Sequence, residues 1–292
     1  FDFGDFAGAH GHFQETVELY DPACHGDFAN RFGQDPRAVA EIYDALILWV
    51  LGRIDEALPL ADRALADAES AAHPPTTGVV LAIAALLGLV RCNPEAVATY
   101  SQAASDIVSR YDLPVFMASR AVFFQGWAKW SDAAEESRLA EMRGGLAIFR
   151  EQGFVWLLPV LEVALAEAEA SAGETDAGLR RVDDALAELE ATAARWYEAE
   201  IHRIRGEILL KRAPADTATA EQSLQAAIAI AQSQKARSFE LRAALALAKL
   251  YRAANRDADA HAVLMPAVEG FPPTQQFPEL TEAQTLLAML NP

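Results

Sequence analysis

The side chains best suited to chemistry in this chain are aromatic and basic residues that could recognise a ligand. Trp127 and Trp130 are three residues apart and share a helix face. Arg120 lies two turns earlier, and Lys129 lies beside the two indoles. Trp and Arg dominate binding hot spots, so a groove holding these four residues would suit a peptide, a partner protein or a small effector. Core packing in an alanine-rich hairpin is the simpler explanation for each Trp taken singly.

A second basic row is formed by His202, Arg203 and Arg205 on one predicted helix. It is the other candidate for binding a partner in a groove. The alternative is that the row forms ion pairs with glutamates of the same helix, namely Glu198, Glu200 and Glu207.

The remaining polar groups predict no metal site and no acid–base pair. His10 and His12 could offer two ring nitrogens to a metal, but two residues apart on a helix they point about 200° from each other. The carboxylates of Glu167 and Glu169 are also two apart and do not converge on one helix face, so we interpret them as solvated charge. The pair Glu198/Glu200 receives the same interpretation.

Motifs for catalysis are missing from the sequence. A phosphate loop needs GxxxxGK[ST], in which backbone amides cradle phosphate oxygens, and this string does not occur. GxSxG, HExxH and CxxC do not occur either. We therefore predict that this segment is not an enzyme and needs no cofactor.

These residues must be positioned by a repeated helical unit, which is clearest at 220–231 (AEQSLQAAIAIA). Its first small residue and the one seven positions on recur along the chain. The first positions are Ala9, Ala57, Ala96, Arg138, Gly178, Ala220 and Ala260, at spacings of 48, 39, 42, 40, 42 and 40 residues. Such a period is typical of stacked helical hairpins.

The repeat predicts an all-α fold: an α-solenoid of about seven hairpins that forms a single domain over residues 1–292. The first helix of each hairpin should line a concave groove, and a helix over Pro278–Leu290 should cap the C-terminal end. Residues 6–20 supply a second helix without a first helix before it. We interpret the sequence as a fragment of a larger protein.

Composition limits the partners. The net charge of −18 disfavours nucleic acid and anionic membranes, whose phosphates require neutralising charge, and favours a basic or non-polar partner. The apolar run Thr76–Val90 is shorter than the roughly 20 residues of a membrane span and predicts a buried helix. Cys24 and Cys92 lie apart and are interpreted as free thiols, although one bridge is also possible. Without a signal peptide, the expected location is the cytoplasm.

Two resemblances follow from particular residues. Gly206 ahead of Ala220, and Leu247, Tyr251 and Ala260 in the next unit, resemble the signature of tetratricopeptide repeats, whose standard length is 34 residues. Longer stretches, including WYEAEIHRIRGEILLKR and SFELRAALALAKLYR, resemble the C-terminal tetratricopeptide region of bacterial multidomain STAND-type ATPases.

Many of those ATPases also carry a class III adenylate or guanylate cyclase domain. The resemblance implies a regulatory or sensing arm that binds a protein or peptide, or the upstream domains of its own chain. It carries no catalytic residue onto this segment. The alternative is a sensor that encloses a small ligand or peptide effector with the aromatic and basic patch.

Overall fold

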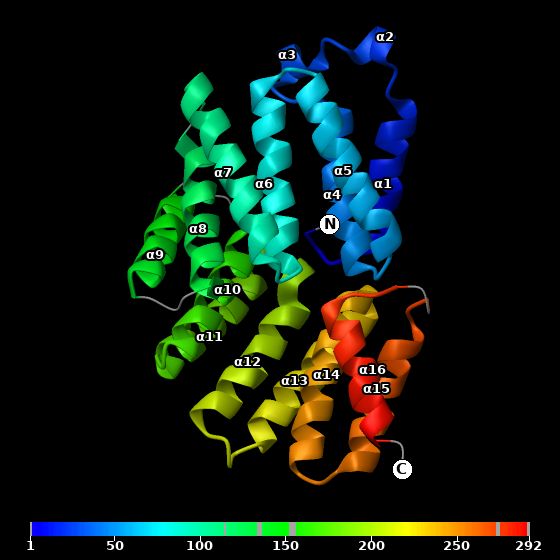
Figure 1. Cartoon of the computed structure of the whole chain (residues 1–292), viewed down its shortest axis with the longest axis vertical. Helices are drawn as coiled ribbons and strands as arrows, with labels where there is room; N and C mark the ends of the chain where they lie inside the picture. Colours follow the sequence, from blue (N-terminus) through cyan, green and yellow to red (C-terminus); the bar gives the residue numbers. More distant parts are fainter. Residues whose placement is uncertain (1, 114, 133–135, 152–155, 273–274, 291–292) are drawn as a thin grey trace.

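A computed structural model describes residues 2–113, 115–132, 136–151, 156–272 and 275–290, without the side chains of 115–121 and 131–132. Within these ranges all regular structure is helical (Figure 1). The helices are α1 (Phe6–Leu19), α2 (Pro22–His25), α3 (Phe28–Phe32), α4 (Pro36–Val50), α5 (Ile54–Ser70), α6 (Pro74–Val90), α7 (Pro94–Tyr111), α8 (Val115–Asp132), α9 (Glu136–Glu151), α10 (Leu158–Ser171), α11 (Thr175–Thr192), the 3₁₀ turn η1 (Arg195–Tyr197), α12 (Glu198–Arg212), α13 (Ala218–Gln234), α14 (Arg237–Ala253), α15 (Asp257–Glu269) and α16 (Pro278–Leu290).

The predicted α-solenoid is confirmed. From α4 onward, consecutive helices pack as hairpins: α4 with α5, α6 with α7, and so on to α14 with α15 (Figure 1). Helix α1 packs on α4, and α16 packs on α14 and α15. The segment after α1, which the sequence predicts as an irregular linker, contains the short helices α2 and α3. Asp21 caps α2 by accepting a hydrogen bond from the backbone N–H of Ala23, and Gly33 ends α3 at φ 80°.

Local signals in the sequence set where the helices begin. Asp35 accepts hydrogen bonds from the backbone N–H of Arg37 and Ala38, so it caps α4, and Pro36 supplies a preset φ at the first helical position. Asn93 caps α7 in the same way, ahead of a proline. The hairpin borders follow from these caps.

The recurring small residues lie where helices cross. Ala57, Ala220, Ala227 and Ala260 are all 0 % exposed. At the same register in α9, a Cβ on Gly145 would lie 2.8 Å from the backbone nitrogen of Phe123 in α8. Small side chains are therefore required at these crossings, which explains the period seen in the sequence.

The first helices of the hairpins are the core of the molecule. Helices α4, α6, α10 and α14 are buried around most of their circumference. A helix that is apolar on all sides must be covered on all sides. The run Thr76–Val90 lies within α6, so the predicted buried helix is confirmed. No helix in the described ranges has the length and hydrophobicity needed to cross a membrane.

The array curves until its ends meet. The six first helices contact one another in the closed order α4, α6, α8, α10, α12, α14 and back to α4. Ser238, the second residue of α14, donates a hydrogen bond to the carbonyl of Trp49 near the end of α4, 189 residues away in the sequence. A Cβ on Gly52 would lie 2.9 Å from Cβ of Arg237. The accessible surface of 12,928 Å² is near the roughly 12,100 Å² expected for a compact protein of 31.6 kDa.

Arg242 joins the ends of this ring. It is 6 % exposed, and its Nη1 donates to the carbonyl of Val90 at 2.7 Å and to Glu200 Oε2 at 3.3 Å. Its Nε donates to Glu279 Oε1 at 2.8 Å, and the guanidinium lies 4.8 Å from the centroid of the Trp49 ring. One side chain in α14 thus contacts α4, α6, α12 and α16.

Buried ion pairs make the stability of the ring depend on pH. Burial by itself raises the pKa of Glu200, but the charges of Arg203 and Arg242 outweigh burial and hold the pKa below its usual 4.5. The pKa of Glu169 is likewise lowered, because its interaction with Arg181 outweighs the effect of burial. A lowered folded pKa stabilises the protein above the unfolded pKa, and this contribution is lost as pH falls through the folded value. We expect the urea concentration at the midpoint of unfolding to be clearly lower below pH 4.5 than at pH 7. Equal midpoints at the two pH values would contradict this pH dependence.

Candidate functional site

The first predicted patch lies largely in the core. Trp127 is 9 % exposed, and Trp130 packs half-buried against the main cluster of apolar residues. Lys129 is exposed, and its Nζ pairs with Glu141 Oε2 at 3.3 Å. Arg120 lies in α8, but its side chain lies outside the described residues. Binding by this patch stays a prediction.

The second predicted row is occupied by ion pairs. Arg203 is 8 % exposed and donates to Glu200 at 2.9 and 3.0 Å and to Glu207 at 2.9 Å. Arg205 donates to Asp183 Oδ1 at 2.8 Å. His202 is half-buried, and burial together with the charge of Arg205 lowers its pKa. Arg203 therefore forms the ion pairs within its own helix that were the alternative to binding. Binding of a partner by this row remains a prediction.

Two interpretations of acidic residues are wrong. Glu169 is 2 % exposed and Glu200 is 0 % exposed, so neither is solvated charge. Glu169 accepts hydrogen bonds from Arg143 in α9 and Arg181 in α11. Spacing within one helix shows which side chains share a face, but both partners of Glu169 lie on neighbouring helices, and so does Arg242, one of the two partners of Glu200.

Other aromatic residues, on or just before four of the first helices, pack against one another. Ring contacts link Tyr43, Trp156, Trp196, Tyr197, Phe239 and Trp49 in that order, at centroid distances between 5.1 and 6.4 Å. Trp156, Trp196, Tyr197 and Phe239 belong to three consecutive hairpins, whereas Tyr43 and Trp49 belong to the distant α4–α5 hairpin. Ring closure brings them together, and they fill the centre of the molecule.

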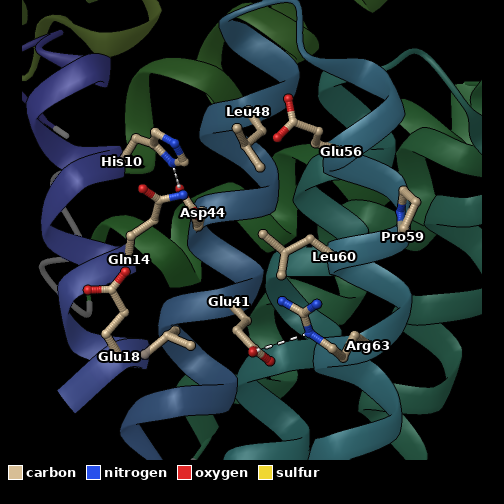
Figure 2. A pocket seen from close by; sticks show the side chains of 11 residues that line it. His10, Gln14, Glu18, Glu41, Asp44, Leu48, Glu56, Pro59, Leu60 and Arg63 are labelled. Carbon is tan, nitrogen blue, oxygen red and sulfur yellow. Dashed lines mark hydrogen bonds and ion pairs between the residues drawn. The ribbon is translucent and has the colours of Figure 1, made fainter. Parts of the chain in front are cut away.

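A pocket lined by several acidic side chains lies between α1, α4 and α5 (Figure 2). Its volume is about 330 Å³. Helix α4 forms the floor, and α1 and α5 form the walls. The lining residues are His10, Gln14, Val17, Glu18, Glu41, Asp44, Leu48, Glu56, Pro59, Leu60 and Arg63. We call this space the α1–α4–α5 pocket.

At one end of the pocket, hydrogen bonds connect Asp44, His10, Arg53 and Glu56 in a chain. His10 Nδ1 lies 2.6 Å from Asp44 Oδ1, and His10 Nε2 lies 2.8 Å from Arg53 Nη1. Arginine can only donate, so Nε2 accepts and Nδ1 carries the proton toward Asp44. Arg53 also donates to both carboxylate oxygens of Glu56. Burial raises the pKa of Asp44 even though His10 lowers it.

The other end holds a carboxylate that is not satisfied. Glu41 is 1 % exposed. Its Oε1 accepts two long hydrogen bonds of 3.3 Å, from Nε of Arg37 and from Nε of Arg63. Its Oε2 is buried and has no hydrogen-bond partner among the described residues. A buried charge without full hydrogen bonding is costly, so this position calls for a functional explanation.

The repeat itself shows that the architecture does not need these acids. In the common register, Glu41 and Asp44 of α4 correspond to Ala244 and Leu247 of α14. The equivalent groove between α13, α14 and α15 is lined by Gln225, Ile228, Ala229, Gln232, Leu247, Tyr251, Arg256, Asp259, Ala262 and Val263, with no carboxylate on its floor. Sequence reasoning missed the α1–α4–α5 pocket, although comparing α4 with α14 position by position would have shown acids where α14 has apolar residues.

Replacing Glu41 with Gln should raise the free energy of unfolding by about 1 to 2 kcal/mol at pH 7, because the variant removes a buried and poorly bonded charge. Glu162 is the matched control, since it holds the same register position in α10. Its oxygens accept from Arg150 and from Arg181, each at 2.6 Å. Glu162→Gln should instead lower stability by roughly 3 kcal/mol. Urea unfolding compares the two, and an equal loss in both would contradict this account of Glu41.

Comparison with known proteins supports the fold. No known family model matches the sequence. An uncharacterised protein of Rhizobium meliloti is 27 % identical over 241 residues, which cover 81 % of this chain and 23 % of that protein. The chain therefore spans about a quarter of that relative.

Two solved structures are similar in shape. The crystal structure of a Rap protein complexed with Competence and Sporulation Factor superposes with a TM-score of 0.64 at 11 % identity, covering 98 % of this chain and 87 % of that one. A STAND protein with a tetratricopeptide repeat sensor from Pyrococcus horikoshii gives a TM-score of 0.49 at 14 % identity, covering 87 % of this chain and 38 % of that one. The first similarity establishes a shared helical-repeat fold.

Proposed function

We propose that this chain is a non-catalytic interaction and regulatory arm of a multidomain signalling protein, of the STAND ATPase or nucleotide cyclase kind. It binds a protein or peptide segment, or the upstream domains of its own parent, and it works in the cytoplasm. The repeat resemblance supports this role, and so does a relative about four times the length of the aligned region.

The single observation that carries the proposal is the α1–α4–α5 pocket. In the other buried glutamates both carboxylate oxygens accept hydrogen bonds: from arginines in Glu162, Glu169 and Glu200, and from Gln232 and Arg237 in Glu240. In the pocket, Glu41 keeps one oxygen without a partner. A group supplied by another molecule would complete its hydrogen bonding.

The mechanism we propose is restraint. The arm restrains the domains attached to it by shape and charge, and the binding of a partner releases the restraint. The ring of first helices is stiff because Arg242 ties four helices together. A stiff arm transmits a change in occupancy to whatever is attached to it.

Titration calorimetry of this chain with the part of the parent protein upstream of Phe1 tests the proposal. We expect saturable one-to-one binding. Absence of heat at high micromolar concentrations would count against it. A nucleotide turnover assay on the chain alone should give the background rate.

The sensor for a small ligand or peptide effector is the second candidate. A pocket of about 330 Å³ lies within the usual range for small-molecule sites, roughly 300 to 1,000 Å³. A ligand-induced rise in melting temperature would favour this function. Loss of the rise in Glu41→Gln would place the ligand in the α1–α4–α5 pocket, whereas loss in Trp127→Ala would place it at the first predicted patch.

A further inference from the structure

We infer that the α1–α4–α5 pocket receives the guanidinium group of an arginine side chain presented by a protein segment. The inference rests on the proposed interaction role and names the chemistry of the partner at that site.

The charge of the pocket favours a cation. Its lining carries four carboxylates, from Glu18, Glu41, Asp44 and Glu56, against one arginine, Arg63. Two further arginines, Arg37 and Arg53, approach from outside the lining and pair with Glu41 and Glu56. These seven groups still leave one excess negative charge, and the whole chain carries −18, so a cation is attracted to the site.

The rest of the molecule indicates which cation. Glu162, at the register position of Glu41, is bonded by the guanidinium groups of Arg150 and Arg181. The planar fork of arginine matches a carboxylate, whereas an ammonium group acts as a point charge. Glu41 has only two long bonds to one oxygen, so the strong guanidinium contact seen at Glu162 is the missing element.

The walls of the pocket suit the remainder of an arginine side chain. Val17, Leu48, Pro59 and Leu60 offer apolar surface to its three methylene groups. Glu41 Oε2 is shielded from solvent, so entry requires a side chain to move. Arg63 is the side chain that must swing, because it is 56 % exposed and is held to Glu41 by a long bond.

Calorimetry with capped five-residue peptides tests the assignment. The probe has one central arginine between two leucines, with glycine at each end. We expect one-to-one binding, at least tenfold weaker when citrulline, neutral and of the same shape, replaces arginine. A lysine peptide should also bind more weakly. No binding at millimolar concentration, or equal affinity for arginine and citrulline, would overturn the inference.

A separate titration with L-arginine amide tests whether the pocket binds arginine in a protein segment or as a free small molecule. Apolar contacts from the flanking residues should make the peptide bind more tightly than the free amino-acid amide. Equal affinity would assign the pocket to a small molecule instead of a protein segment, which contradicts the inference.

Variants of the chain locate the bound peptide. Glu41→Gln should weaken arginine-peptide binding at least tenfold, because it removes the buried charge. Glu69→Gln is the matched control: it removes one exposed charge from α5 away from the pocket, and affinity should stay within twofold. Arg63→Ala should strengthen binding by removing the competing cation.

Unchanged affinity in Glu41→Gln would overturn the inference, since folding of that variant is checked independently by its melting curve. If the upstream segment of the parent binds both wild type and Glu41→Gln equally, this inference fails while the proposed interaction role survives. If the upstream segment does not bind at all, the proposed role fails, and the peptide titration still decides the pocket.

Discussion

Replacing Arg242 with Met should lower the free energy of unfolding by about 3 to 5 kcal/mol at pH 7, because it leaves Glu200 buried without this charge partner. Arg242 also holds the carbonyl of Val90 and packs over Trp49, so its loss opens the contact between the two ends of the ring. Methionine keeps most of the side-chain volume, which isolates the charge and the hydrogen bonds. Urea unfolding at neutral pH measures the loss.

Arg252→Met is the matched control, because Arg252 lies exposed on the same helix, and its guanidinium donates a hydrogen bond to the sulfur of Met289 at 3.4 Å. This variant should change stability by less than about 0.5 kcal/mol. Small-angle X-ray scattering should also show a larger radius of gyration for Arg242→Met alone. A loss below 1 kcal/mol, with unchanged scattering, would mean that Arg242 does not hold the ring closed.

Replacing Ala227 with Arg should unfold at least two repeats. Ala227 is 0 % exposed and lies in α13, which packs against α12 and α14. An arginine there overfills a helix crossing, which costs about 1 to 3 kcal/mol, and buries a charge without a partner, which costs more. Circular dichroism should show lost helicity and a broad melt at low temperature.

Ala229→Arg is the control, because it makes the same substitution at an exposed position of the same helix. It should keep the helicity and melting temperature of the wild type. If Ala227→Arg also kept both, the repeat register assigned to the sequence would be wrong.

The hairpins could be predicted because their signals are local. Small residues recur at crossings such as Ala57 and Ala227, and residues such as Asp35 and Asn93 mark where helices begin. Closure of the ring could not be predicted, because it depends on small rotations that accumulate over six hairpins. The contact between Ser238 and Trp49 spans 189 residues and leaves no periodic trace.

The candidate site was missed for a related reason. The sequence placed Trp49, Trp156 and Trp196 on first helices, which line the concave side of an open solenoid. In the closed ring this side is the core, and Trp196 is 0 % exposed. The informative signal was a difference between hairpins: Glu41 and Asp44 stand where α14 has Ala244 and Leu247.

The central claim is that this chain holds its partner at the α1–α4–α5 pocket on the outside of a closed array. Hydrogen–deuterium exchange with and without the capped arginine peptide tests it most directly. We predict slower exchange on binding in residues 6–19 and 36–63, and loss of that protection in Glu41→Gln. Protection confined to the segment around Lys129, or to the helix carrying His202, Arg203 and Arg205, would contradict the claim.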